Sequence, residues 1–228
     1  MCGRFTLTLS AEAIKSYFDI TDGLILQPHY NIAPSANVLV VRQLERHPRE
    51  FAFMRWALVP SWLNETDITS HWINARAETI EEKPLFRQAF HQRRCLIVAD
   101  GFFEWKLQGK IKQPIYIRKL DHSPIAFAGI WEHWQNKDGK TIESCAIITT
   151  VANALLKPIH GRMPVMLDQK DFALWLDNQN ANPHDIKILL KPFSAKSLER
   201  YPVSLQVNKP SYDSKDCIKP LDKNKKTS

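Results

Sequence analysis

The apolar positions of this chain gather in short runs that are typical of β-strands rather than of long helices. Val, Ile, Phe, Trp and Thr, which favour strands, are frequent in these runs. The glycine-containing stretches LQGK and NKDGK predict hairpin turns between two pairs of them. We therefore predict strands in residues 37–43, 50–60, 95–100, 101–106, 113–120, 124–134, 141–150 and 202–207.

Helical spacing of apolar residues is restricted to a few shorter segments. In SAEAIKSYF, Ile14, Tyr17 and Phe18 share one helical face, and Ser10 is a favourable N-cap residue. Similar patterns predict helices in residues 83–94, 153–159, 171–177 and 184–190. Many short strands with few helices between them predict an α+β fold. We expect a single β-rich domain in which helices flank a curved, barrel-like antiparallel sheet.

The composition sets the limits of this domain and suggests its partner. The chain has 228 residues, the length of one substantial domain. Residues 211–228 are polar, with five lysines and three aspartates, so we predict a domain over residues 1–210 and a disordered tail after it. The net charge is +7, and the body stays basic without the tail. A basic excess favours a polyanionic partner but does not establish one.

The cysteines and the N-terminal sequence indicate the cellular compartment. None of the four cysteines forms a CxxC pair, so we predict no metal site and no cofactor. Cys95 and Cys145 lie in apolar runs and read as buried thiols. The chain shows neither a signal-peptide pattern nor an apolar window long enough to span a membrane. These observations predict a reduced, cytoplasmic protein.

The first residues, MCGRF, place a cysteine where removal of Met1 would make it the N-terminal residue. Cys2 would then carry a free α-amine and a thiol on the same residue, which no internal cysteine can offer. The alternative is that Cys2 is simply a small residue near a frayed end. The rest of the chain has to decide between these interpretations.

Polar side chains interrupt three apolar or strand-like stretches, HWINARAET, ADGFFEWK and KPIHGRMPVML. Glu104 stands among aromatic residues, and burial of a carboxyl raises its pKa in a way that suits a general acid or base. Asn74 and Arg76 alternate with alanines and so share one face of an extended segment. His160 follows a proline-containing turn. Taken singly, each of these residues is also compatible with a structural role.

In order along the chain, MCGRF, YNIAPS, INARAET, DGFFEWK and HGRMPVML resemble the motifs of the SOS-response-associated peptidase (SRAP) family. These proteins process abasic sites and crosslink themselves to single-stranded DNA. The resemblance runs from Cys2 to about Val207. It implies a single β-rich α+β domain with the N-terminal cysteine in a central pocket beside a DNA groove. The domain predicted over residues 1–210 is therefore SRAP-like.

The resemblance also implies roles for individual residues. The nucleophile corresponds to Cys2, and the supporting active-site positions correspond to Asn74, Glu104 and His160. DNA-binding positions correspond to Arg4 and Arg76, which would contact phosphates, and to Trp62, which would lie near the DNA path. One departure concerns position 161, where many members have aspartate and this chain has glycine.

The expected function is the covalent capture of abasic sites in single-stranded DNA through a thiazolidine formed by Cys2, which shields the strand from cleavage. The resemblance further implies a peptidase activity on the protein's own N-terminus and a monomer that works at the nucleoid or replication fork if the source is prokaryotic. Two alternatives stay open. Cys2, His160 and Asn74 superficially match a cysteine protease that acts in trans. The basic residues and tryptophans also suit a non-catalytic module that binds single-stranded DNA.

Overall fold

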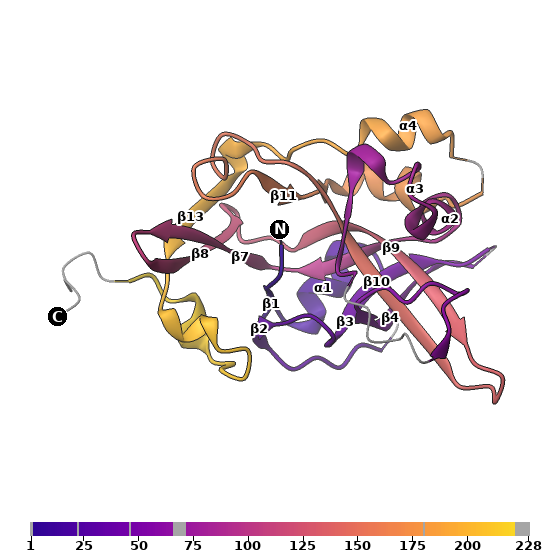
Figure 1. The fold of residues 1–228 in the computed structure, drawn as a ribbon, viewed down its shortest axis with the longest axis horizontal. Coiled ribbons are helices and arrows are strands. Elements are labelled where there is room, and N and C mark those ends of the chain that lie inside the picture. Colours follow the sequence, from indigo (N-terminus) through magenta and orange to yellow (C-terminus); the bar gives the residue numbers. More distant parts are fainter. Residues whose placement is uncertain (1, 22, 46, 66–71, 180, 222–228) are drawn as a thin grey trace.

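The computed structural model describes residues 2–21, 23–45, 47–65, 72–179 and 181–221, and strands are its predominant regular element (Figure 1). The strands are β1 Phe5–Leu7, β2 His29–Ile32, β3 Asn37–Gln43, β4 Arg49–Trp56, β5 Asn74–Arg76, β6 Arg94–Ala99, β7 Gly101–Gln108, β8 Ile111–Lys119, β9 Ile125–Gln135, β10 Thr141–Val151, β11 Arg162–Pro164, β12 Met166–Leu167 and β13 Leu198–Pro202. The α-helices are α1 Ala11–Phe18, α2 Pro84–Gln92, α3 Phe172–Leu176 and α4 Pro183–Ile188.

These strands form two sheets, one of which closes on itself. The first sheet has the order β13-β8-β7-β1-β2, and the second has the order β11-β10-β4-β3-β6-β9-β12 with β5 beside β10. Because β10 also pairs with β9, the strands β10, β4, β3, β6 and β9 close into a five-stranded barrel. The predicted single α+β domain with a curved, barrel-like sheet is therefore confirmed.

Most neighbouring strands run antiparallel, but β10 pairs in parallel with β4 and with β5. Ser144 lies opposite Arg55, and Ile147 lies opposite Asn74. The long strand β10 thus holds together segments that are far apart in the sequence. This pairing fixes β5, which carries Asn74, against the barrel.

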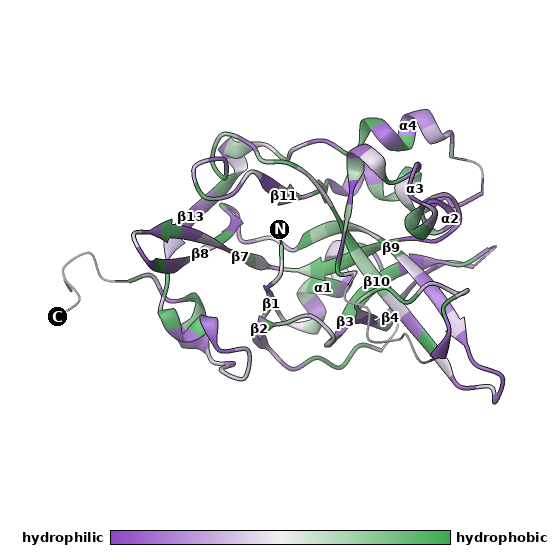
Figure 2. Ribbon diagram, in the orientation of Figure 1, coloured by the Kyte–Doolittle hydropathy of each residue, from purple (hydrophilic) through white to green (hydrophobic). Residues whose placement is uncertain are grey.

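The two faces of the barrel strands contribute to different cores. On one face, Val40, Ile97 and Phe127 pack in a cluster that also includes Phe5 and Phe102 of the first sheet. The other face carries Leu39, whose cross-strand partner Phe53 is 53% exposed, so this face points outward. Figure 2 shows the apolar residues concentrated along these central strands.

Helices cover much of the outward face. The apolar sides of α1, α2 and α3 belong to one cluster with the outward side chains of the barrel, and they contribute Ile14, Phe18, Phe86, Phe90, Phe172 and Trp175. Helix α1 begins as the sequence predicts, because the Ser10 hydroxyl accepts a hydrogen bond from the Ala13 amide at 3.2 Å. No helix within the described residues is long and apolar enough to cross a membrane.

Two segments differ from the elements that their sequences predict. Residues 153–159 form turns instead of a helix, although the Lys157 amide still donates to the Asn153 carbonyl at 2.9 Å. Residues 202–207 do not form one strand, since β13 ends at Pro202 and a 3₁₀ turn covers Leu205–Asn208. Each segment still buries an apolar side chain, Leu156 in the first and Val207 in the second.

Residues 211–221, the first part of the expected tail, pack on the body of the protein. A 3₁₀ turn at Lys215–Ile218 buries Cys217 beside Phe103 and Val203. Asp213 accepts hydrogen bonds from the amide of Tyr30 at 2.6 Å and from His29 Nδ1 at 2.8 Å. The polar composition of this segment predicts disorder instead, because only a few apolar side chains take part in the packing. Residues 222–228 lie outside the described residues.

Gly101, at the start of β7, shows why the DGFFEWK motif contains glycine. A Cβ atom at this position would stand 2.1 Å from the hydroxyl oxygen of Tyr116. Only glycine lets β7 pass this ring, so the residue supports a close packing contact. It thereby helps to fix the strand that carries Glu104.

Candidate functional site

Cys2 is fully buried just before β1, at the junction of the two sheets. Phe5 of β1 lies opposite Phe102 of β7, and the Phe103 amide donates to the Arg4 carbonyl at 2.9 Å. This antiparallel pairing draws the N-terminal residues alongside the part of β7 that carries Glu104. The N-terminal segment before β1 lies near the middle of the view in Figure 1, next to β7. Cys2 is therefore a fixed residue of the interior and not part of a frayed end.

Asn74 reaches Cys2 from the opposite side. Its Nδ2 donates a hydrogen bond of 2.9 Å to the Cys2 carbonyl oxygen. Its Oδ1 is buried and has no hydrogen bond to any residue that the structure describes. The side chain thus holds the backbone of Cys2 and keeps one acceptor near it.

Glu104 is the buried carboxyl of the site, with only 2% of its surface exposed. Burial raises the pKa of this carboxyl, while nearby His160 opposes the rise. Burial also raises the pKa of the Cys2 thiol, and the charge of Glu104 raises it further. The arrangement therefore favours a protonated thiol, and it makes the Glu104 carboxyl hold its proton more tightly than an exposed carboxyl does.

His160 is oriented by the turn that leads into β11. The Arg162 backbone amide lies 3.0 Å from His160 Nδ1, and since an amide N–H can only donate, Nδ1 accepts. The Arg162 carbonyl oxygen also lies 3.3 Å from Nδ1, so both backbone groups of Arg162 hold the ring in place. A Cβ atom at Gly161 would meet nothing within 4 Å, so the turn would accept a side chain there. The imidazole keeps this anchor without an aspartate at position 161.

An open pocket of about 490 Å³ gives access to this region. Glu104 and His160 line it together with Arg4, Trp105, Leu107, Lys112 and Asn208. Basic and aromatic side chains thus surround a buried carboxyl and an imidazole. Such a pocket suits an anionic substrate that undergoes proton transfer.

Arg4 is buried, and its guanidinium is hydrogen-bonded within the protein rather than exposed for contact with a phosphate. Its Nη1 donates to Asn31 Oδ1 at 2.7 Å and to the Val207 carbonyl at 2.9 Å. Its guanidinium also lies over the Trp105 ring at 5.9 Å from the centroid. Arg4 reaches the pocket wall, but it also ties the N-terminal segment to the C-terminal part of the chain.

Asn31 is a residue whose role the sequence did not reveal. It stands in the YNIAPS motif, and its Nδ2 donates to the carbonyls of Val207, Lys209 and Tyr212 at 3.3, 3.1 and 2.7 Å. Together with Arg4 it holds the segment that carries Asn208, whose Oδ1 accepts from Trp105 Nε1 at 2.6 Å. The only hint in the sequence is an asparagine inside a motif with no assigned chemistry.

The other two expected DNA-binding residues lie on the surface. Arg76 is exposed at the end of β5, two residues after Asn74. Trp62 is 62% exposed. The structure adds Arg162 beside His160, whose guanidinium contacts Glu78 at 2.6 and 2.9 Å and the Thr149 carbonyl at 2.6 Å. Of these three residues, Arg76 and Trp62 are exposed, whereas the charge of Arg162 is paired with Glu78.

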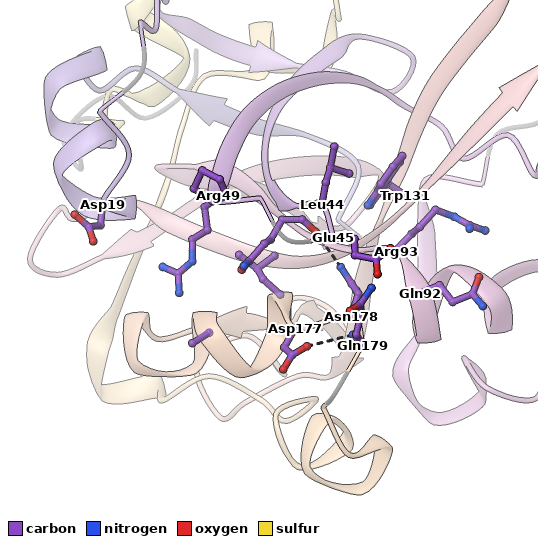
Figure 3. Close-up of a pocket in the computed structure, with 14 residues that line it drawn as sticks. Asp19, Leu44, Glu45, Arg49, Gln92, Arg93, Trp131, Asp177, Asn178 and Gln179 are labelled. Carbon is purple, nitrogen blue, oxygen red and sulfur yellow. Dashed lines mark hydrogen bonds between the residues drawn. The ribbon is translucent and has the colours of Figure 1, made fainter.

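A second and larger hollow of about 1180 Å³ lies elsewhere, between the β3–β4 connection and the ends of α2 and α3 (Figure 3). It is lined by side chains such as Arg49, Arg93, Trp131 and Asn178, and by none of the seven residues singled out in the sequence. Arg93 is paired with Glu132 at 2.8 Å. No cysteine, serine or threonine is among the described residues that line this hollow. Among the described residues, no group of three or more His, Cys, Asp or Glu side chains is placed to hold a metal ion.

Comparisons with known proteins agree with this geometry. The family model of SOS response associated peptidase (SRAP) matches residues 1–210, so the chain belongs to the SRAP family. It is 40% identical to the abasic site processing protein YoqW of Bacillus subtilis, over 96% of this chain and 99% of that protein. It is 30% identical to the abasic site processing protein HMCES of Xenopus tropicalis, over 96% of this chain and 78% of that protein.

Solved structures show the same fold. A crystal structure of a protein from Bacteroides thetaiotaomicron matches with a TM-score of 0.87 at 28% identity, over 96% of this chain and 100% of that chain. A protein from Bordetella bronchiseptica matches with a TM-score of 0.78 at 24% identity, over 90% of this chain and 100% of that chain. The barrel and the sheet beside it are thus shared with experimentally determined structures.

Proposed function

We propose that this protein processes abasic sites in single-stranded DNA and captures them covalently through Cys2 once Met1 has been removed, by the protein itself or by an aminopeptidase. The observation that carries the proposal is the placement of Cys2. It is fixed in the interior by Asn74, and Glu104 stands nearby on the wall of an open, basic pocket. The names of the relatives YoqW and HMCES support the same substrate.

The chemistry begins at the amine. An abasic residue is a hemiacetal in equilibrium with an open-chain aldehyde at C1′. An α-amine has a pKa of about 7.7–8.0, so an appreciable fraction is neutral and nucleophilic near neutral pH. The amine adds to C1′ and the resulting carbinolamine loses water to give an imine. The thiol then adds across the C=N bond, its proton passes to nitrogen, and a five-membered thiazolidine closes with the overall loss of one water.

The buried groups suit the proton transfers of this sequence. Glu104 can donate its proton to the departing hydroxyl of the carbinolamine and take up the N–H proton as the imine forms. It can then relay the thiol proton to nitrogen as the ring closes. His160 can assist opening of the sugar ring. Asn74 holds the backbone of Cys2, and the thiol needs no further orientation because it belongs to the residue that bears the amine. The saturated ring prevents the β-elimination that an open imine invites, so the strand stays intact.

The state of the thiol argues against a cysteine protease that acts in trans. Such enzymes lower the pKa of their cysteine to generate a thiolate. Here burial and Glu104 raise the pKa of the Cys2 thiol. His160 Nδ1 is occupied by a backbone amide. These features support a reaction that the amine begins.

Exposed basic and aromatic side chains suit contact with single-stranded DNA. Exposed Arg76 can contact a phosphate, and exposed Trp62 offers a ring on which a base can stack. The net charge of +7 favours the approach of a polyanion. We propose that the protein acts as a monomer inside the cell, at the nucleoid or replication fork if the source is prokaryotic.

Mass spectrometry of the denatured protein after incubation with an oligonucleotide that contains one abasic site tests the proposal. We expect an adduct whose mass is that of mature protein plus DNA less one water, on an uncleaved strand. Cys217→Ala, which removes a different thiol, should give the same adduct, whereas Cys2→Ala should give none that survives denaturation. A wild-type protein that leaves no adduct, or that cleaves the strand, would refute the proposal.

A further inference from the structure

The hairpin of β7 and β8 exposes apolar side chains among lysines. Leu107 is 67% exposed and Ile111 is 55% exposed. Exposed Lys110 and Lys112 lie beside them. In Figure 1 the hairpin extends from the part of β7 that lies next to the N-terminal segment. An exposed apolar residue flanked by cations suits contact with a nucleic acid, because bases offer apolar faces and phosphates offer charge.

Only part of this hairpin reaches the active site. Leu107 and Lys112 lie directly opposite each other in the register of β7 and β8. Both line the 490 Å³ pocket together with Glu104 and His160, whereas Ile111 and Lys110 do not. We call Leu107 and Lys112 the hairpin rim. The rim is therefore on the pocket wall, and the neighbouring pair of the same residue types is outside it.

Abasic DNA, the substrate of the proposed function, has an unstacked base next to the abasic residue. An abasic residue lacks a base, so the base of the flanking nucleotide loses a stacking neighbour on one side. An apolar side chain at the edge of the pocket can cover that face and recover part of the lost contact. An ammonium group opposite it can meet the phosphate that joins the two nucleotides.

We propose that the hairpin rim binds the nucleotide that flanks the abasic residue, with Leu107 against its base and Lys112 at its phosphate. The inference rests on the proposed function and extends it, since it makes capture sensitive to the presence of a neighbouring base. The rim takes no part in the covalent steps. Its effect is confined to binding and can be measured without crosslinking.

The test for Leu107 uses a tetrahydrofuran analogue of the abasic residue, which has no aldehyde and cannot crosslink. Fluorescence anisotropy gives the Kd of wild type, Leu107→Ser and the matched control Ile111→Ser for two strands. In one strand the analogue is flanked by purines, and in the other its neighbours are also tetrahydrofuran residues. We expect Leu107→Ser to weaken binding on the order of fivefold on the purine-flanked strand only. Ile111→Ser should bind both strands like wild type.

The test for Lys112 uses the salt dependence of the same binding. The plot of log K against log salt has a negative slope. Lys112→Gln should make that slope less steep by about 0.7, the value of one phosphate contact on a single strand. Lys110→Gln, the matched control, should leave the slope within error of wild type.

The inference is overturned if Leu107→Ser weakens both strands equally, or if each rim variant behaves like its control. That result leaves the proposed function standing whenever wild type still forms the crosslink with a true abasic site. A wild-type protein that forms no such crosslink refutes the proposed function and the inference with it. The two failures are thus distinguished by wild type alone.

Discussion

Two hollows of this protein differ in size and in chemistry, and the smaller one contains the groups that we propose to react. The hollow beside α2 and α3 measures about 1180 Å³, and the pocket lined by Glu104 and His160 measures about 490 Å³. In the larger hollow, the charge of Arg93 is paired with Glu132, and Trp131 Nε1 is a buried group that can only donate. In the smaller pocket, the buried carboxyl of Glu104 has a raised pKa and lies near a thiol.

Under the proposed function, the placement of titratable groups rather than volume decides which hollow reacts. Proton transfer needs a group that can both donate and accept near neutral pH. Burial raises the pKa of the Glu104 carboxyl and so moves it toward this condition. In the larger hollow, the charge of Arg93 is paired with Glu132. The following predictions test this contrast, in order of decreasing effect.

The largest effect should follow from Glu104→Gln. The amide keeps the shape of the side chain but cannot take up and release a proton, so we expect the rate of crosslinking to fall by about 100-fold or more. Arg93→Gln, which alters the larger hollow, should leave the rate unchanged. Single-turnover kinetics on a denaturing gel measure both. Equal rates for Glu104→Gln and wild type would remove the basis for distinguishing the two hollows.

Arg4 and Arg76 should respond in different ways. Arg4→Ala removes charge-assisted hydrogen bonds to Asn31 and to the Val207 carbonyl, so we expect a loss of about 1.5–3 kcal/mol in the free energy of unfolding. Arg76→Ala should change stability by less than about 0.5 kcal/mol, because Arg76 is exposed. Arg76→Ala should instead make the negative slope of log K for DNA binding against log salt less steep by about 0.7. Urea unfolding and salt titrations provide the measurements, and a fully stable Arg4→Ala protein would show that its buried bonds do not hold the segment.

Two asparagines give a matched test of position. Asn74 donates to the Cys2 carbonyl at 2.9 Å, and Asn178 in the larger hollow accepts from the Arg94 amide at 2.9 Å. Alanine at either position should lower the free energy of unfolding by about 1 kcal/mol. Only Asn74→Ala should slow crosslinking, by about tenfold, because only Asn74 holds the reacting residue. If Asn178→Ala slowed the reaction equally, the effect would reflect stability alone.

The smallest effect concerns stability and pH. Burial raises the pKa of Glu104 above its ordinary value of 4.5, so the folded protein keeps this proton at pH values where the unfolded chain has released it. Stability therefore falls as pH rises above 4.5, until the folded pKa is passed. Glu104→Gln removes this penalty, so its Tm should exceed that of wild type at pH 7 and approach it near pH 4. A Tm difference that is constant with pH would contradict the raised pKa.

The sequence predicts most of the strands and the fold class, because alternation and β-branched residues report local burial. It does not reveal how β10 closes the barrel, since its parallel contacts with β4 and β5 join residues far apart in the chain. The sequence also predicts a helix at residues 153–159, where the structure has turns. Their apolar spacing reports burial but not the regular element that produces it.

For the candidate site as well, the sequence indicates some residues and leaves others to be found in the structure. The ordered motifs indicate Cys2, Asn74, Glu104 and His160, and the structure places Asn74 and Glu104 beside Cys2 and His160 near Glu104. The part played by Asn31 depends on carbonyl groups of residues 207–212. Backbone carbonyls have no signature in the sequence, so such a contact can be found only in the folded chain.

The central claim is that the α-amine of Cys2 begins the reaction and the thiol completes it. The most direct measurement is the yield of heat-stable crosslink from a variant with a glutamate inserted between Met1 and Cys2, which keeps the thiol and turns the amine into an amide. Circular dichroism first establishes that the variant is folded, and wild type and Cys2→Ala are run beside it on a denaturing gel with abasic single-stranded DNA. The account predicts a stable crosslink from wild type, none from the blocked variant, and from Cys2→Ala only an imine that borohydride traps. A heat-stable crosslink from the folded, blocked variant would show that the thiol suffices and would contradict the thiazolidine mechanism.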